Sequence, residues 1–179
     1  MKKKNEDILA SYVDALRPII YINHFDSVAV DKSIQRIGQT AKILEFNNAF
    51  GVVDFESKSP MFECGLEEFL KMSWEDGYEQ QTFIVLKDVH EELPSPKVTA
   101  ILKRIAENTL NRENYFCTVF IVAPKTIIPV ELENYITIFD IPLPSNDEIM
   151  EIIQEFIRTM DISVEEASAW QSPADPVPF

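Results

Sequence analysis

Residues 26–33 read Asp-Ser-Val-Ala-Val-Asp-Lys-Ser and keep the spacing of a phosphate-binding loop, Gly-x4-Gly-Lys-Ser. Asp26 and Asp31 stand at the two glycine positions, and Lys32 and Ser33 stand where that loop has its phosphate lysine and magnesium hydroxyl. The glycines let successive backbone amides curl around an anion, whereas two carboxylates block that curl and repel phosphate. The segment is therefore either an eroded nucleotide loop or a chance Lys-Ser pair.

A second candidate group follows an apolar run. Residues 83–86 lead through Lys87 to Asp88, which is the pattern of a Walker B strand whose acid holds a metal ion. That motif places a glutamate directly after the aspartate to activate water, and here the next residue is Val89. Hydrolysis by the usual route is therefore not expected. In the alternative interpretation, Asp88 simply caps the loop after the strand.

Two pairs of histidine and aspartate suggest a different chemistry. His24 and Asp26, and again Asp88 and His90, are two residues apart at the ends of two predicted strands, so each pair shares a face. Together they could form a metal site, and the protein would then be a metal- or phosphate-dependent enzyme. The pairs come from separate loops, and this spacing also arises by chance. The metal site therefore stands as an alternative to a domain without a metal.

Composition excludes several classes. The chain has 179 residues and a formal net charge of −14, which argues against nucleic acid or an anionic membrane as the main partner. It has four glycines where average usage gives about a dozen, and none of them form a GxGxxG or GxxxxGK pattern. Its two cysteines form no CxxC pair, and no apolar run approaches the roughly 18 residues of a spanning helix. We expect a soluble, reduced, cytoplasmic protein without a standard nucleotide loop.

Hydrophobic periodicity predicts the elements that position these residues. Helical spacing of apolar residues predicts helices at 8–16, 28–37, 62–74, 96–112, 145–159 and 163–170, with a short helical turn at 129–132. Short apolar runs predict strands at 18–22, 41–46, 82–86, 116–123 and 135–139, with 50–55 as a further extended segment.

This alternation is typical of one fold class. The strands are almost unbroken apolar runs, which indicates that both faces of the sheet are covered. We expect an α/β domain, a three-layer sandwich with a mostly parallel sheet. Sites in such sheets form at the carboxyl ends of strands, so the positions of interest are residues 23–26, 87–90, 124–126 and 140–144.

Three stretches, residues 83–90, 118–124 and 131–148, together resemble AAA-family ATPases. The run TVFIVAPKTIIPVELENYITIFDIPLPSNDEI is similar to the AAA segment from the sensor 1 strand to the start of the helical lid. It looks closest to the N-terminal half of a bacterial and plastid group, in which a Walker-less P-loop-like domain precedes an intact ATPase domain. The resemblance covers roughly residues 8–160. It implies a five-stranded, P-loop NTPase-like parallel sheet in the order 5-1-4-3-2.

The resemblance also implies that most of the nucleotide machinery is missing. Lys32 and Ser33 match only the end of Walker A and Asp88 matches the Walker B aspartate, so these three are expected to be vestigial nucleotide-site positions. The polar sensor 1 position falls near Lys125, and the arginine-finger region, residues 132–135, contains no arginine. No catalytic residue and no cofactor are expected in this domain, and ATP and magnesium are expected only in the parent protein.

The resulting hypothesis has three segments: an AAA-like core at 1–144, the start of a lid at 145–170, and a disordered proline-rich tail at 171–179. The domain is expected to be a non-catalytic interaction or regulatory module of an AAA ATPase. Its partner would be a protein or other AAA subunits or domains, with an oligomer formed through the parent AAA domain. A further alternative is a free-standing acidic adaptor, because residues 126–179 hold 11 acidic residues and one basic residue.

Overall fold

The computed structural model describes residues 5–24, 26–75, 78, 80–141 and 146–159. Contacts divide the chain into two compact units, 1–141 and 142–179, and each is described by itself. The first unit contains the helices α1 (Asn5–Asp14), α2 (Ser27–Ile37), α3 (Leu66–Glu75) and α4 (Pro96–Asn111) and the 3-10 turn η1 (Val130–Leu132). Its strands are β1 (Ile19–Asn23), β2 (Lys42–Asn47), β3 (Gly51–Val53), β4 (Pro60–Phe62), β5 (Thr82–Lys87), β6 (Cys117–Ala123) and β7 (Ile136–Asp140).

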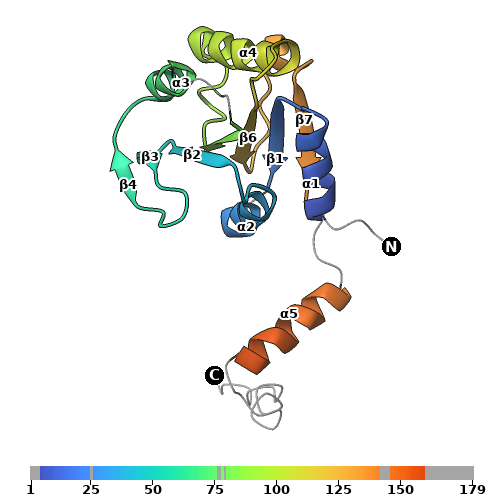
Figure 1. Cartoon of the computed structure of the whole chain (residues 1–179). Helices are drawn as coiled ribbons and strands as arrows, with labels where there is room; N and C mark the ends of the chain where they lie inside the picture. Colours follow the sequence, from blue (N-terminus) through green and yellow to red (C-terminus); the bar gives the residue numbers. More distant parts are fainter. Residues whose placement is uncertain (1–4, 25, 76–77, 79, 142–145, 160–179) are drawn as a thin grey trace, which may run out of the picture. The chain divides into compact units, whose positions relative to one another are not determined.

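The strands form one mixed sheet in the order β4-β3-β2-β5-β6-β1-β7 (Figure 1). Strands β2, β5, β6, β1 and β7 pair in parallel, while β3 and β4 pair antiparallel at the β2 edge. The prediction of a five-stranded, mostly parallel sheet is therefore wrong, since the sheet has seven strands and is mixed. The five parallel strands, numbered among themselves along the chain, do lie in the order 5-1-4-3-2.

The extra strands come from a segment that sequence patterns describe poorly. β3 falls within the predicted extended segment 50–55. β4 is only three residues long, all of them exposed, and it begins with Pro60. Proline is confined to sheet edges because it has no N–H to donate, and β4 is an edge strand. The helix predicted from residue 62 consequently begins at Leu66.

Gly51, the first residue of β3, is held in a left-handed backbone conformation with φ +73°. A Cβ at this position would lie 2.7 Å from the carbonyl oxygen of Phe62 and 2.9 Å from the amide nitrogen of Cys64. Both neighbours are backbone atoms, so the clash cannot be relieved by rotating a side chain. The residue therefore sets how closely β3 approaches the chain that follows β4.

Replacing Gly51 with alanine is expected to lower the free energy of unfolding by about 2 kcal/mol, since the left-handed conformation alone costs an L-residue about 1–2 kcal/mol. Urea denaturation measures the loss. Gly65→Ala is the matched control, because nothing lies within 4 Å of a Cβ there, and its cost should stay below about 1 kcal/mol. Equal losses in the two variants would contradict this account of Gly51.

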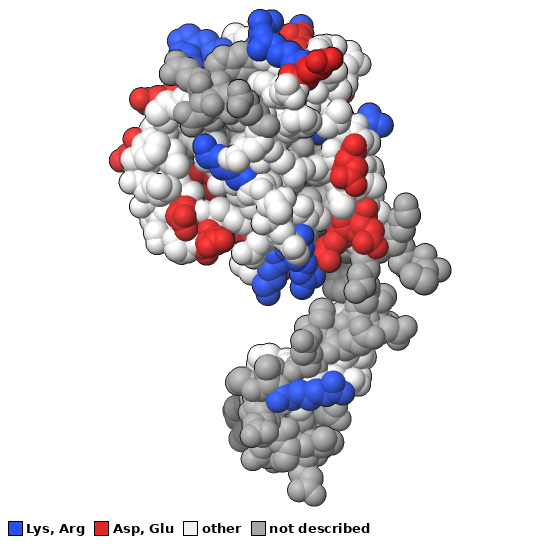
Figure 2. Space-filling model, in the orientation of Figure 1, with Lys and Arg blue, Asp and Glu red and all other residues white. Residues whose placement is uncertain are grey.

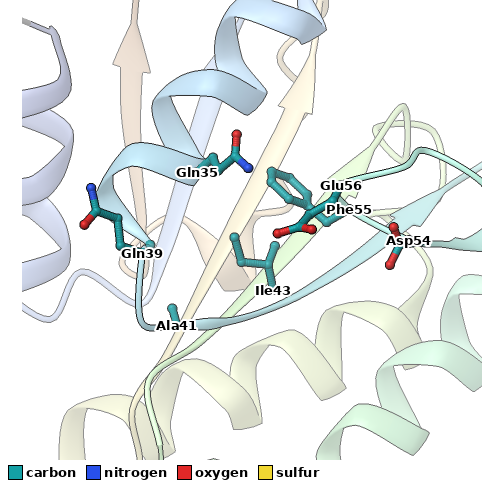
Figure 3. Close-up of a pocket in the computed structure, with 8 residues that line it drawn as sticks. Gln35, Gln39, Ala41, Ile43, Asp54, Phe55 and Glu56 are labelled. Atoms are coloured by element: carbon teal, nitrogen blue, oxygen red, sulfur yellow. The ribbon is translucent and has the colours of Figure 1, made fainter.

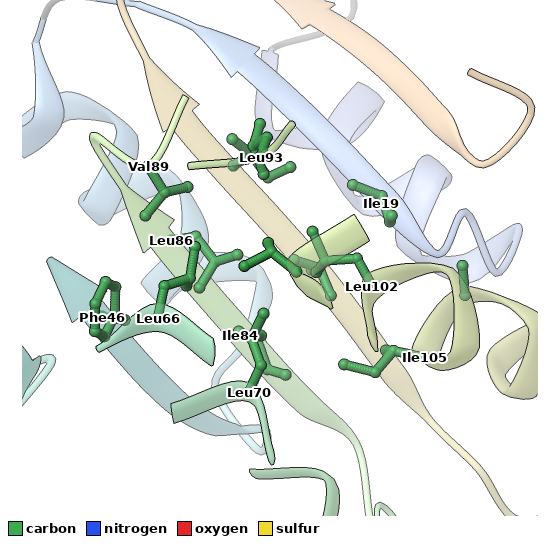
Figure 4. Close-up of a cluster of buried hydrophobic side chains, with 14 of the residues drawn as sticks. Ile19, Phe46, Leu66, Leu70, Ile84, Leu86, Val89, Leu93, Leu102 and Ile105 are labelled. Carbon is green, nitrogen blue, oxygen red and sulfur yellow. The ribbon is translucent and has the colours of Figure 1, made fainter. Parts of the chain in front are cut away.

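Helices cover both faces of the sheet, as expected for a three-layer sandwich (Figure 1). On one face, α3 and α4 pack against the sheet through buried side chains that include Leu66, Leu70 and Leu102 (Figure 4). On the other face, α1 and α2 pack through Leu9 and Ile34. The central strands β5 and β6 are buried along their whole length, which explains why they read as unbroken apolar runs.

The second unit contains helix α5 (Asn146–Thr159). Its exposed apolar residues include Ile149, Met150 and Ile153. The predicted helix at 163–170 and the predicted tail at 171–179 lie outside the described residues. Within the described residues, no helix combines the length and apolar character needed to cross a membrane.

Candidate functional site

The carboxyl ends of four parallel strands meet at one edge of the sheet. Asn47 at the end of β2 is in register with Lys87 at the end of β5, and Lys87 is in register with Val122 of β6. Asn23, which ends β1, is in register with Ala123 of β6. The predicted strand-end loops after β1, β5 and β6 are therefore neighbours. This is where open α/β sheets form their sites.

The connection between β1 and α2 is short, and Asp26 caps the helix. Asp26 has an extended backbone, and its Oδ1 accepts hydrogen bonds of 3.0 Å from the amides of Val28 and Ala29. The amide of Asp26 in turn donates to Nδ1 of His24 at 2.9 Å. First-turn amides of this kind bind phosphate in nucleotide loops, and here a carboxylate of the chain itself accepts from them. Asp26 thus serves as a helix cap at the first glycine position of the sequence pattern.

Replacing Asp26 with alanine should cost about 1 kcal/mol of unfolding free energy, because two first-turn amides lose their acceptor. Ser95→Ala is the matched control, since Ser95 occupies the N-cap of α4 but makes no side-chain cap hydrogen bond. Thermal and urea unfolding should show a loss for Asp26→Ala and little change for Ser95→Ala. A loss of similar size in both variants would argue that the Asp26 carboxylate is not the source.

Lys32 and Ser33 lie inside α2 rather than at its start. Lys32 is exposed, and the Ser33 hydroxyl donates back to the carbonyl of Ala29 at 3.1 Å within the helix. Asp88 is exposed, has a left-handed φ of 57°, and donates its amide to the carbonyl of Val122. The structure thus places Lys32 and Asp88 on the lining of one cleft, while the Ser33 hydroxyl donates its hydrogen bond within α2.

A partly buried network of four charges lines the same cleft as Lys32 and Asp88. The Nζ atom of Lys87 lies 2.6 Å from Oδ2 of Asp31 and 3.1 Å from Oε1 of Glu45. Lys58 reaches the same two acids, with Nζ 2.9 Å from Asp31 Oδ2 and 2.6 Å from Glu45 Oε2. The side chains of Glu45 and Lys87 are only 3% and 8% exposed. Two positive charges and two negative charges therefore balance one another, with Lys58 at the exposed side of the network.

The network holds Lys87 in its charged form. Burial lowers the pKa of the Lys87 ammonium, but the hydrogen bond and charge of Asp31 and the charge of Glu45 outweigh burial and raise the pKa above its ordinary value. The ring of Phe55 adds a cation–π contact, with its centroid 3.8 Å from Nζ of Lys58. Asp31, at the second glycine position of the pattern, is thus one of the two acids that both lysines share.

Sequence reasoning missed this network. Its four members come from α2, β2, the segment between β3 and β4, and β5, so no short-range spacing connects them. One signal was available: Lys87 extends an apolar strand, and Glu45 lies between apolar neighbours in β2. Charged side chains are rarely buried unless they are paired, so two such residues on adjacent strands indicate a partner.

A cleft of about 380 Å³ opens above the network, between α2 and the turn that joins β2 to β3. We call it the α2–β3 cleft. Its lining residues are Ser27, Val28, Asp31, Lys32, Gln35, Glu45, Asn47, Phe50, Val53, Phe55, Glu56, Lys58, Lys87 and Asp88. Two of the three predicted nucleotide-site residues, Lys32 and Asp88, belong to this lining.

A second cleft of about 450 Å³ lies toward the opposite end of β2 (Figure 3). Gln35 of α2 and Gln39, which follows the end of α2, border it on one side. The segment 54–56 borders it on the other, and Ile43 of β2 also lines it. This cleft shares Gln35, Phe55 and Glu56 with the first one but is not lined by the last residues of the parallel strands. Its polar groups are amides and two carboxylates, without a histidine, cysteine or lysine.

The histidine and aspartate pairs do not form a metal-binding group. Among the described residues, which include His24, Asp26, Asp88 and His90, no three or more His, Cys, Asp or Glu side chains are arranged to hold a metal ion. His24 accepts a backbone hydrogen bond, and His90 lies 3.9 Å from Glu91. The metal alternative thus gains no support from the geometry.

The positions that the AAA resemblance assigns to sensor 1 and to the arginine-finger region make contacts within the domain. Lys125, near the sensor 1 position, pairs with Glu91 at 3.1 Å and accepts a hydrogen bond at its carbonyl from the Tyr21 hydroxyl. That pairing, together with the charge on His90, lowers the pKa of the Glu91 carboxyl. Residues 132–135 begin with the last residue of η1, Leu132, whose side chain is buried in the core.

The parallel strand order, the helices on both faces and the strand-end cleft define an α/β domain of the AAA and P-loop class. Within that class, a model of the SpoVK-like AAA ATPase N-terminal domain matches residues 4–141, and the chain belongs to this family. The resemblance inferred from sequence is thus confirmed at the level of the family. The matched region coincides closely with the first compact unit.

Related proteins agree with this assignment. A curated AAA domain-containing protein of Guillardia theta, ycf46, is 31% identical over 90 residues, covering 50% of this chain and 17% of that protein. The RuvB Holliday junction branch migration motor of Thermotoga maritima has a TM-score of 0.59 at 14% identity, covering 94% of this chain and 54% of RuvB. A chain of the E. coli HORMA:CdnC:Trip13 complex has a TM-score of 0.59 at 9% identity, covering 97% and 74%. At such low identities, the structural matches establish the fold alone.

Proposed function

We propose that this domain is a non-catalytic AAA-type module that serves an AAA ATPase as an interaction or regulatory part. The observation that carries the proposal is the Asp26 cap. Its carboxylate accepts from the first-turn amides of α2, the position at which a nucleotide loop holds phosphate. A phosphate at this position would have to displace a carboxylate and stand beside its negative charge.

Two further features support the absence of catalysis. Asp88 is followed by Val89, which is fully buried, so no carboxylate at that position can activate water. The carboxylate of Asp31 already forms ion pairs with two lysines, and it would face the phosphates of a nucleotide bound at this loop. ATP and magnesium would then bind in another domain of the parent protein. The proposal of a longer parent fits the curated relative, of which the match covers 17%.

The proposed partners are proteins, including other AAA subunits or domains, and the proposed location is the cytoplasm. The net charge of −14 disfavours nucleic acid and anionic membranes. On the face drawn in Figure 2, lysine and arginine side chains occur in separate small groups rather than as a continuous basic surface. Structural relatives include both a Holliday junction motor and a complex with HORMA, so the charge is the feature that favours protein partners here.

Isothermal titration of the domain with ATP and magnesium tests the proposal. We expect no heat of binding and no shift of the thermal unfolding midpoint, because a ligand that binds only the folded state must raise that midpoint. An intact P-loop ATPase titrated under the same conditions is the control for sensitivity. Micromolar binding of ATP to this domain would overturn the proposal.

A further inference from the structure

The mouth of the α2–β3 cleft carries two exposed apolar side chains on its lining. Val28, in the first turn of α2, is 61% exposed, and Phe50, in the turn between β2 and β3, is 58% exposed. A single exposed apolar residue is ordinary on a protein surface. Here two of them line the same cleft from different elements.

Both side chains stand where local structure favours polar residues. Turn positions favour Gly, Asn, Asp, Ser and Pro, and helix first turns favour acidic or small polar side chains. The turn at Phe50 is nevertheless well formed: the Phe50 amide donates to the carbonyl of Asn47 at 3.1 Å, and the Ala49 amide donates to Asn47 Oδ1 at 2.8 Å. The backbone that carries Phe50 is therefore held in place, which lowers the backbone entropy lost when a partner covers this residue.

The charges of the cleft define what such a partner must carry. Asp31, Glu45, Lys58 and Lys87 neutralise one another. Of the other lining residues, Glu56 and Asp88 are acidic and Lys32 is basic, and none of these three forms an ion pair within the described part of the chain. The mouth therefore has an excess of one negative charge on a protein whose net charge is −14.

We infer that the α2–β3 cleft docks a segment of a partner protein that places a bulky apolar side chain between Val28 and Phe50 and an adjacent arginine or lysine beside Asp88 and Glu56. The inference rests on the proposed function, since it names the surface through which the interaction module acts. An exposed aromatic residue on a well-ordered turn is suited to be the centre of a binding hot spot, and the charges supply register and selectivity. The acidic mouth disfavours nucleic acid and nucleotides as occupants.

The probe is a synthetic peptide, acetyl-Gly-Ser-Leu-Arg-Ser-Gly-amide, titrated into the ¹⁵N-labelled domain. Two matched peptides replace the arginine with glutamate or the leucine with serine. We expect shifts of the amide resonances of Val28, Phe50 and Asp88 with the first peptide, and binding at least about tenfold weaker with each of the others. Affinity should fall as salt is raised.

Variants of the domain locate the binding surface. Phe50→Ser and Val28→Ser should each weaken binding of the first peptide by about tenfold or more, and Asp88→Asn should reduce its salt dependence. Met61→Ser is the matched control, because Met61 is 64% exposed on β4 and does not line the cleft. Retained dispersion of the amide spectrum in each variant shows that the fold is intact.

Equal binding of the glutamate peptide, shifts outside the cleft, or no shifts at all would overturn the docking inference. These outcomes leave the proposed function standing, provided that the ATP titration shows no binding. Binding of ATP with shifts at the same residues would overturn both. The two failures are thus distinguishable in the same spectra.

Discussion

Replacing Lys87 with methionine is expected to lower the free energy of unfolding by about 3–5 kcal/mol. The substitution removes one of two cations from a network in which Glu45 is 3% exposed and Asp31 is 13% exposed. The acids then keep only Lys58, whose side chain is 40% exposed. An uncompensated buried charge costs several kcal/mol because the charge has lost its water without gaining a partner.

Urea denaturation of a set of variants can separate the charge effect from lost packing. Lys71→Met is the surface control, since Lys71 pairs with Glu67 four residues earlier in α3 and such pairs contribute about 0.3–0.5 kcal/mol. Adding Glu45→Gln to Lys87→Met should recover part of the loss, because the excess negative charge is removed together with the cation. A loss below about 1 kcal/mol for Lys87→Met would mean that Lys58 alone balances both acids.

The same residues show how far sequence could predict the site. The strand-end positions were predictable, because the apolar runs fix where parallel strands stop and the sheet brings those ends together. The role of Asp26 as a helix cap could also be predicted, because an aspartate directly before an amphipathic helix is a strong N-cap signal. The glycine-loop spacing of residues 26–33 explains only which residues are missing. The structure shows what Asp26 does there, since its carboxylate accepts from two first-turn amides.

The parts that sequence could not predict depend on long-range contacts. Asp31 and Lys87 are 56 residues apart, and their pairing requires this turn of α2 to lie within reach of the side chain that ends β5. Strand β4 carries Pro60 and no apolar alternation, so its own pattern does not predict its pairing with β3. The two strands are joined by a turn at residues 54–59, in which the Asp54 amide donates to the carbonyl of Ser59 and Lys58 has a left-handed φ of 58°. Local patterns report the period of an element but not which charges meet across elements.

Raising the pH from about 8 to about 11 is expected to lower the free energy of unfolding by about 4 kcal/mol. Burial raises the pKa of the Cys117 thiol well above its ordinary value of 9.0. Burial, with smaller contributions from Cys117 and Tyr78, likewise raises the pKa of the Tyr115 hydroxyl well above 10.0. Both groups therefore stay protonated in the folded state at pH values where they ionise in the unfolded chain.

Stability falls with rising pH because the folded state keeps protons that the unfolded chain releases. Above about pH 9 the unfolded chain has released the Cys117 proton and the folded state has not, so the folded state binds more protons and stability falls as pH rises. The contribution is fully present below the unfolded pKa and is lost as the pH rises through the folded pKa. At two pH units above 9.0, the Cys117 thiol has lowered the free energy of unfolding by about 3 kcal/mol. At one unit above 10.0, the Tyr115 hydroxyl has lowered it by about 1.4 kcal/mol. The raised pKa of Lys87 acts in the same direction.

Denaturation midpoints measured at successive pH values in the presence of a phosphine reductant test this expectation. In Cys117→Ala the fall between about pH 9 and pH 10 should largely disappear, because tyrosine ionisation begins only near the upper end of that window. Cys64→Ala is the matched control, since Cys64 is only partly buried and should leave most of the fall in place. An unchanged fall in Cys117→Ala would assign the alkaline sensitivity to the growing negative charge of the whole chain instead, since a large net charge destabilises the compact state through self-repulsion.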